Sequence, residues 1–135
     1  TRRDAEEFVA TNMSEPWQRL PTFGVVLDGK LVGTVNFEID EATRTAMIGY
    51  AIGRAWWGRG LAPEAARAAL KWAIQQFGLL RVWASTQVDH ARSQRVMEKL
   101  GMVREGVRVG DHLQRDGTAV DEVLYRLDVA PDLAR

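Results

Sequence analysis

Residues 56–64 read Trp-Trp-Gly-Arg-Gly-Leu-Ala-Pro-Glu, a glycine-rich turn that leads directly into a helical pattern. Gly58 and Gly60 can adopt backbone conformations that are unfavourable for other residues, and Pro63 fits the first turn of a helix. The free amides and the dipole of a helix N-terminus attract anions. The segment therefore predicts a turn that holds a phosphate or pyrophosphate. The alternative is a tight strand-to-helix turn that binds nothing.

A strand–helix–strand unit surrounds this turn. Residues 45–53 alternate as a strand, and residues 61–77 carry apolar side chains at helical spacing up to Gly78, which predicts a left-handed cap. Residues 80–86 form a second β-branched and aromatic run. Because the helix connects the two strands by a crossover, they are expected to be parallel neighbours.

A second helix is expected at about residues 90–100, with Asp89 as its N-cap and Gly101 at its end. Antiparallel hairpins flank the central unit. Asp28-Gly29 separates two apolar runs and favours a type I′ turn, and residues 115–117 predict the turn of a closing hairpin. The strands expected in these hairpins are 23–27, 30–39, 103–113 and 119–127.

These elements predict one α/β domain over residues 1–135, with a mixed sheet in which antiparallel strands flank a central parallel pair. The front of the chain is expected to differ. Residues 4–13 predict a short helix with carboxylates in its first turn, and Pro16 and Pro21 follow it as breakers.

Composition excludes several classes of protein. The 18 basic residues balance 18 acidic ones, so nucleic acid and anionic membranes are not expected as partners. The absence of cysteine excludes disulfides, thiol nucleophiles and Cys-ligated zinc, and His90 and His112 are too few for a metal site. No apolar run approaches the length of a membrane span, so we expect a cytoplasmic protein.

Three segments occur in a fixed order: Ile-Gly-Tyr-Ala-Ile at 48–52, Trp-Gly-Arg-Gly-Leu-Ala at 57–62, and Asp-His-Ala-Arg-Ser-Gln-Arg-Val-Met-Glu-Lys-Leu-Gly-Met at 89–102. Together they resemble the GNAT superfamily of acetyl-CoA-dependent N-acetyltransferases, in particular its RimJ/RimL-like branch of ribosomal-protein N-terminal acetyltransferases. The resemblance implies that acetyl-CoA (coenzyme A) is the acyl donor, without a metal. It implies a pantetheine site between two splayed parallel strands, at the main chain around Ile52. The backbone amides implied to hold the pyrophosphate are those of Trp57, Gly58, Arg59, Gly60, Leu61 and Ala62.

The chain departs from the family pattern at several positions. Ala55 occupies the Gln or Arg position of the phosphate turn, with Arg54 next to it. The resemblance implies an Asn where this chain has His90, which can donate one similar hydrogen bond to the cofactor. Related sequences often carry a Glu at the position of Met47. The N-terminal strand of the family is expected to be missing, which leaves a sheet edge open to pairing in a homodimer.

Ser93 is the candidate residue for protonating or hydrogen-bonding the departing thiolate. It shares one helix face with three apolar residues at helical spacing, so its hydroxyl is expected to point into the fold. Those residues are Val96, Met97 and Leu100. The alternative is a buried hydroxyl that bonds back to its own helix.

Glu38 is the candidate general base. Strand 30–39 places it with Thr34 and Asn36 on the face opposite the apolar residues, where it could accept a proton directly or through water. The alternative is a solvated strand carboxylate. The apolar face is expected to consist of Leu31, Gly33, Val35, Phe37 and Ile39.

The sequence thus predicts transfer of an acetyl group from acetyl-CoA to a primary amine, on a protein N-terminus or a small molecule. The amine would attack directly in a ternary complex, with a backbone amide of the splayed strand stabilising the oxyanion. Two other functions stay open: a non-catalytic acyl-CoA-binding or regulatory module, and a phosphate-binding protein unrelated to coenzyme A.

Overall fold

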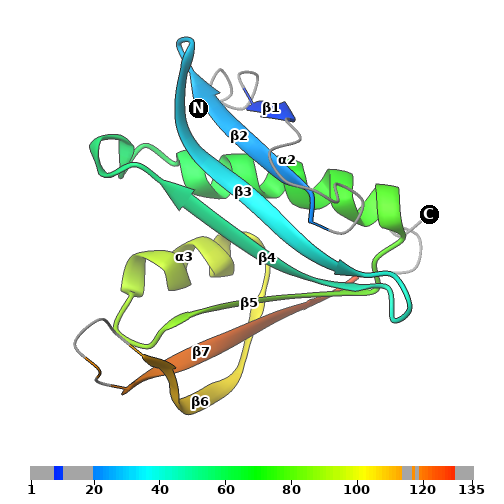
Figure 1. The fold of residues 1–135 in the computed structure, drawn as a ribbon, viewed down its shortest axis with the longest axis vertical. Coiled ribbons are helices and arrows are strands. Elements are labelled where there is room, and N and C mark those ends of the chain that lie inside the picture. Colours follow the sequence, from blue (N-terminus) through cyan, green and yellow to red (C-terminus); the bar gives the residue numbers. More distant parts are fainter. Residues whose placement is uncertain (1–7, 11–19, 114–116, 118, 130–135) are drawn as a thin grey trace.

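The computed structural model describes residues 8–10, 20–113, 117 and 119–129 of the 135-residue chain. These residues form one mixed sheet in the order β1-β2-β3-β4-β5-β7-β6, accompanied by the helices α2 and α3 and the 3₁₀-helix η1 (Figure 1). The elements are β1 (Phe8–Ala10), β2 (Thr22–Leu27), β3 (Lys30–Asp40), β4 (Thr45–Ile52), η1 (Arg54–Trp56), α2 (Leu61–Phe77), β5 (Arg81–Gln87), α3 (Ala91–Lys99), β6 (Val103–Leu113) and β7 (Ala119–Asp128).

The predicted elements around the glycine turn are confirmed. α2 follows directly after Gly60 and ends before Gly78, which is left-handed at φ 61° and ψ 40°. Asp28 and Gly29 both have positive φ, as a type I′ hairpin requires. β6 and β7 form the closing antiparallel hairpin, and Gly117 is the residue of its predicted turn that the structure describes. The predicted mixed α/β fold is therefore confirmed.

The front of the chain differs from its prediction. Residues 8–10 form β1, which pairs with β2 in antiparallel register from Phe8 opposite Val25 to Ala10 opposite Phe23. The prediction of a helix is wrong there, and β2 is not the open sheet edge that was expected. β2 would otherwise present unpaired backbone groups at the sheet edge, and pairing outweighs the weak helical preference of three residues. The other residues of the predicted helix lie outside the described residues.

The start of β3 also differs from its prediction. Leu31 was expected to face the core but is 58% exposed, and its neighbour Val32 is buried instead. The register of β2 and β3 shifts between Val25 and Val26, and an extra residue at such a bulge reverses the alternation. Beyond the bulge the predicted alternation returns, with Val35, Phe37 and Ile39 buried.

α2 packs across the sheet and fixes the glycine turn that precedes it. Its buried face is rich in small residues, which let the helix lie close to the strands. These residues are Leu61, Ala65, Ala66, Ala69, Leu70, Ala73 and Ile74. At its C-terminal half, Trp72 packs edge-to-face against Phe23 of β2, with ring centroids 5.0 Å apart.

β4 and β5 separate along their length. They are parallel neighbours, as predicted, but their pairing is confined to Thr45–Met47 opposite Arg81–Trp83. β4 continues to Ile52, whereas β5 pairs with β7 through to Gln87. Figure 1 shows the two strands close at one end and apart at the other, with α3 between them in this view. The splayed pair that the family resemblance implied is thus present.

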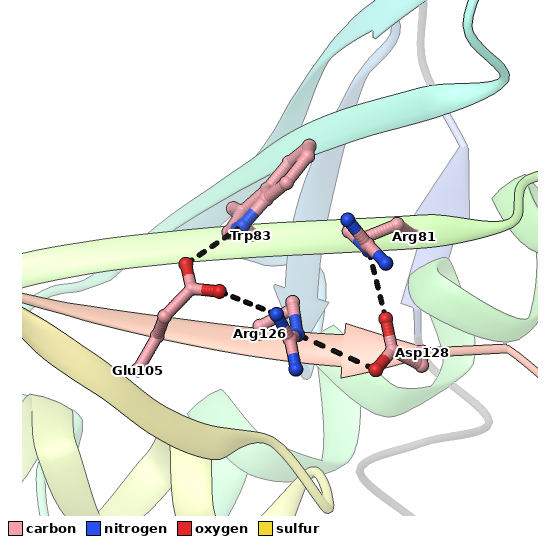
Figure 2. Close-up of polar contacts among 5 residues, drawn as sticks. All are labelled: Arg81, Trp83, Glu105, Arg126 and Asp128. Atoms are coloured by element: carbon pink, nitrogen blue, oxygen red, sulfur yellow. Dashed lines mark hydrogen bonds and ion pairs between the residues drawn. The ribbon is translucent and has the colours of Figure 1, made fainter.

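A polar network connects β5, β7 and β6 on the sheet face opposite the buried residues Val82 and Ala84 (Figure 2). Arg126 bridges Glu105 and Asp128, and Asp128 also accepts a bond from Arg81 at 2.8 Å. The other carboxylate oxygen of Glu105 accepts the indole N–H of Trp83 at 3.3 Å. Exposed ion pairs of this kind add little stability singly, but the network fixes the orientation of the Trp83 ring.

Gly33 is expected to be essential for the close approach of β3 and β4. A β-carbon at this position would lie 2.3 Å from the backbone oxygen of Ala51, so Gly33→Ala must displace the strand. We expect the substitution to lower the free energy of unfolding by about 1–3 kcal/mol in urea denaturation. Gly106→Ala is the matched control, because an added β-carbon there has no neighbour within 4 Å. Equal effects of the two substitutions would contradict this explanation.

Candidate active site

A cleft of about 360 Å³ lies beside the end of β4 that has separated from β5. Its walls come from β4, the glycine turn, the first turn of α2 and the cleft-facing side of α3. The lining residues are Tyr50, Ala51, Ile52, Trp56, Trp57, Gly58, Gly60, Leu61, Ala62, Pro63, His90, Arg92, Ser93, Arg95, Val96 and Lys99.

The glycine turn supplies backbone donors to this cleft. Gly58 and Gly60 have φ values of 81° and 75°, which glycine adopts without strain. Gly60 is the N-cap of α2, and its carbonyl accepts the first helical bond, from the Glu64 N–H at 3.2 Å. The N–H groups of Gly60, Leu61 and Ala62 precede that bond and receive no side-chain cap. They are available, together with the helix dipole, to bind an anion.

Positive side chains strengthen this preference for anions. Arg92, Arg95 and Lys99 line the cleft, and none of the described carboxylates does. The guanidinium carbon of Arg92 lies 4.1 Å from the centre of the Trp57 ring, while the Trp57 indole N–H donates to the Ile52 carbonyl at 2.7 Å. Trp57 therefore connects the turn both to α3 and to β4, the two sides of the cleft.

His90 begins α3, a role that the sequence analysis gave to Asp89. Its Nδ1 accepts the Ser93 N–H at 3.2 Å, so the imidazole acts as the side-chain cap. The prediction of Asp89 as N-cap is wrong, because the helix starts one residue later than expected. Because Nδ1 accepts this bond, Nε2 is the ring nitrogen left as a donor, and His90 is one of the residues that line the cleft.

Ser93 lies at the cleft wall with Tyr50 of β4. The Tyr50 hydroxyl donates to the Ser93 backbone oxygen at 3.1 Å and lies 3.2 Å from Ser93 Oγ. The predicted inward position of Ser93 is therefore observed, and its side-chain oxygen contacts a residue of the strand β4. Burial raises the pKa of Tyr50 above the usual 10.0, although the hydrogen bond with Ser93 opposes this shift. The phenol is thus neutral near pH 7.

Comparison with known proteins identifies the family of this fold and cleft. The family model described as "Acetyltransferase (GNAT) domain" matches residues 1–103, well over half of the chain. The chain belongs to the GNAT acetyltransferase family. The predicted resemblance to this family, including its RimJ/RimL-like branch, is confirmed.

Individual GNAT relatives support the same assignment. The chain is 31% identical over 105 residues to the [ribosomal protein uS5]-alanine N-acetyltransferase of Escherichia coli (strain K12), covering 76% of this chain and 53% of that protein. A structure of the microcin C7 self-immunity acetyltransferase MccE, in complex with acetyl-CoA and AMP, is 26% identical with a TM-score of 0.71, covering 83% of this chain and 62% of that one.

The fold is also that of the ribosomal L7/L12 acetyltransferase RimL in complex with coenzyme A. That match has a TM-score of 0.80 at 18% identity and covers 85% of this chain and 65% of that one. The chain spans 45–62% of the length of the curated relatives that it matches.

The structure brings together most of the residues that the GNAT resemblance singled out. Ile52, Trp57, Gly58, Gly60, Leu61, Ala62 and His90 all line the cleft with Ser93. Arg59 belongs to the same turn but not to the lining. Arg54 is next to Ala55, the residue that differs from the family's Gln or Arg. Its guanidinium carbon lies 5.4 Å from the centre of the Trp57 ring.

Glu38 lies in a different place. It is exposed on β3, directly opposite Met47 of β4, and lines a second hollow of about 610 Å³. This hollow involves the paired end of β4, whereas the cleft involves its separated end. Its lining consists of Glu38, Ile39, Asp40, Glu41, Thr45, Ala46, Met47 and Trp83.

Within the described ranges, no group of three or more His, Cys, Asp or Glu residues is placed to hold a metal ion. Among those same residues, no helix is both long enough and apolar enough to cross a membrane.

Tyr50 is the site residue that sequence reasoning missed. It lies on the same face of β4 as Ile48 and Ile52, a pattern that is typical of an apolar strand face. Its signal was a hydroxyl among aliphatic residues, since buried phenols usually have a hydrogen-bond partner. Its partner, Ser93, is 43 residues away in sequence, so only the fold could reveal the contact.

Alkaline pH tests the environment of both tyrosines. Burial also raises the pKa of Tyr125. The negative charge of Glu98, to which the Tyr125 hydroxyl donates at 3.2 Å, is the second largest cause and raises this pKa further. A raised pKa stabilises the fold below pH 10, and this contribution is lost as pH rises toward the folded-state pKa values. We expect the free energy of unfolding to fall more steeply from pH 9 to 11 in wild type than in the Tyr50→Phe/Tyr125→Phe variant. Identical slopes would show that the phenols titrate normally.

Proposed function

We propose that this chain transfers the acetyl group of acetyl-CoA to a primary amine, on a protein N-terminus or a small molecule. The observation that carries the proposal is one cleft that joins anion-binding amides at the start of α2 to the Ser93 hydroxyl on α3, beside an unpaired strand edge. A long thioester with phosphates at one end and a reactive carbonyl at the other fits that arrangement. The domain's GNAT membership supports the same chemistry.

Acetyl-CoA would be held mainly by backbone groups. The N–H groups of Gly60, Leu61 and Ala62 suit its pyrophosphate, and the side chains of Arg92 and Arg95 lie in the same cleft. The pantetheine arm would follow β4 near Ile52, where β5 no longer supplies a strand partner among the described residues. Backbone N–H and C=O groups along this free edge can pair with the amides of the arm, as a strand would.

The transfer reaction then needs three groups from the protein: a donor to the oxyanion, an acid for the thiolate and a base for the amine. The neutral amine attacks the thioester carbonyl, so that a C–N bond forms and the C–S bond breaks. A backbone N–H of β4 stabilises the intermediate oxyanion, and Ser93 gives a proton to the departing thiolate. The amine loses one proton to a base, and the proton count therefore balances.

Glu38 is the base that we propose for the amine. It pairs across the strands with Met47, the last residue of β4 that still pairs with β5. Paired side chains on one face have β-carbons about 5 Å apart, so Glu38 occupies nearly the space of a carboxylate at position 47. The family pattern often places a Glu there.

The second hollow fits the amine side of this reaction. Glu38, Asp40 and Glu41 line it, and none of the described Lys or Arg residues does. This charge attracts ammonium groups. Trp83, held by Glu105 as Figure 2 shows, forms part of its wall beside Met47. An amine could enter from this face of the sheet while the thioester enters through the cleft.

The decisive test follows the release of free thiol from acetyl-CoA. Purified protein is mixed with acetyl-CoA and either a peptide with a free N-terminal alanine, the same peptide with a blocked N-terminus, or small primary amines. We expect thiol release that depends on a free amine. Thermal stabilisation by coenzyme A without amine-dependent release would indicate a non-catalytic acyl-CoA-binding module. Absence of any stabilisation would overturn the coenzyme A assignment itself.

Glu38→Gln tests the base. The amide cannot accept the amine proton, so we expect kcat/KM for the amine to fall roughly a hundredfold. Glu122→Gln on β7 is the control, because it makes the same chemical change outside both the cleft and the second hollow. Melting temperatures of both variants verify folding. Equal activity of Glu38→Gln and Glu122→Gln would remove Glu38 from the mechanism.

A further inference from the structure

Tyr50 is the strand residue whose hydroxyl spans the cleft to Ser93. β4 and α3 form opposite walls there, and the Tyr50 hydroxyl lies within hydrogen-bond distance of both the backbone oxygen and the Oγ of Ser93. The contact with Oγ is 3.2 Å, and either oxygen can be its donor. The position of the serine oxygen is thus determined from across the cleft.

The two hydroxyls can satisfy each other in two ways. When Tyr50 donates to the Ser93 backbone oxygen, Ser93 donates its own proton to the phenol. When another acceptor in the cleft takes the serine proton, the phenol can turn and donate to Ser93 Oγ. The phenol has a single proton, so both short contacts are hydrogen bonds only in the first arrangement. In the second arrangement the Ser93 backbone oxygen receives no proton from Tyr50.

We propose that Tyr50 is a positioning residue that aims the Ser93 hydroxyl at the acyl-donor sulfur and hydrogen-bonds its oxygen while the serine proton is shared with the thiolate. This inference rests on the proposed function. The proton that Ser93 gives to the sulfur leaves a serine oxygen with extra negative charge, which the phenol stabilises. The proton released by the amine returns to Ser93 through water, so the cycle is balanced.

Tyr125 provides a matched control within the same helix contact. Its hydroxyl also binds α3 from a strand, donating to Glu98 at 3.2 Å, with Gln94 at 3.5 Å. It is buried, lies on β7, and is absent from the cleft lining. Loss of either hydroxyl therefore removes a bond between a strand and α3, but only the Tyr50 hydroxyl bonds to Ser93.

The kinetic test compares Tyr50→Phe, Tyr125→Phe, Ser93→Ala and Tyr50→Phe/Ser93→Ala. We expect Tyr50→Phe to lower kcat about tenfold, the value of one hydrogen bond to a charged oxygen, with KM for acetyl-CoA within about twofold. Tyr125→Phe should lower the melting temperature and leave kcat within about twofold. In the Ser93→Ala background, Tyr50→Phe should have no further effect on kcat.

If the wild type is active, three kinetic results would overturn the inference while leaving the proposed function intact. The first is an unchanged kcat in Tyr50→Phe, and the second is an equal fall of kcat in Tyr125→Phe. The third is an undiminished effect of Tyr50→Phe on kcat in the Ser93→Ala background. An inactive wild type that is still stabilised by coenzyme A would instead overturn the proposed function.

A spectroscopic test works without turnover. The chain contains only two tyrosines, so fluorotyrosine incorporated into Tyr125→Phe protein yields one ¹⁹F signal, from position 50. We expect coenzyme A to shift this signal, and Ser93→Ala to remove most of the shift. Equal shifts with and without the serine hydroxyl would show that Tyr50 does not act through Ser93.

Discussion

The separation of β4 from β5 is the constraint on which the site depends. The strands are held together at Thr45–Met47 and Arg81–Trp83, and beyond that point β5 pairs with β7. A strand edge without a partner is costly inside a sheet, because its backbone groups need hydrogen bonds from elsewhere. Here that edge faces the cleft, so the fold supplies ready backbone donors and acceptors to an extended ligand.

The two helices supply the functional groups on either side of this opening. α2 brings uncapped amides to one end of the cleft, and its alanine-rich face keeps the helix close to the sheet. α3 brings Ser93 and three cationic side chains to the other wall, and tyrosines from β4 and β7 hold it in place. None of the charged side chains that the structure describes is buried in this arrangement.

Local sequence signals predicted most of the fold and one end of the site. Asp28-Gly29, Gly60 and Gly78 specify backbone conformations by themselves, so the hairpin and the bounds of α2 were predictable. β1, the exposed Leu31 and the His90 cap were not, since each depends on a neighbouring strand or on a shift of one residue. The Tyr50–Ser93 contact joins residues from distant segments, which periodicity cannot relate. The cleft and the second hollow beside β4 likewise could not be predicted, because their positions depend on strand register.

The position of the acyl donor is measured most directly in a crystal structure of the chain with coenzyme A. We predict pyrophosphate oxygens within hydrogen-bond distance of the Gly60, Leu61 and Ala62 N–H groups, and the sulfur beside Ser93 Oγ where β4 and β5 part. Coenzyme A bound outside this cleft, or a sulfur far from Ser93 with the phosphates in place, would contradict it.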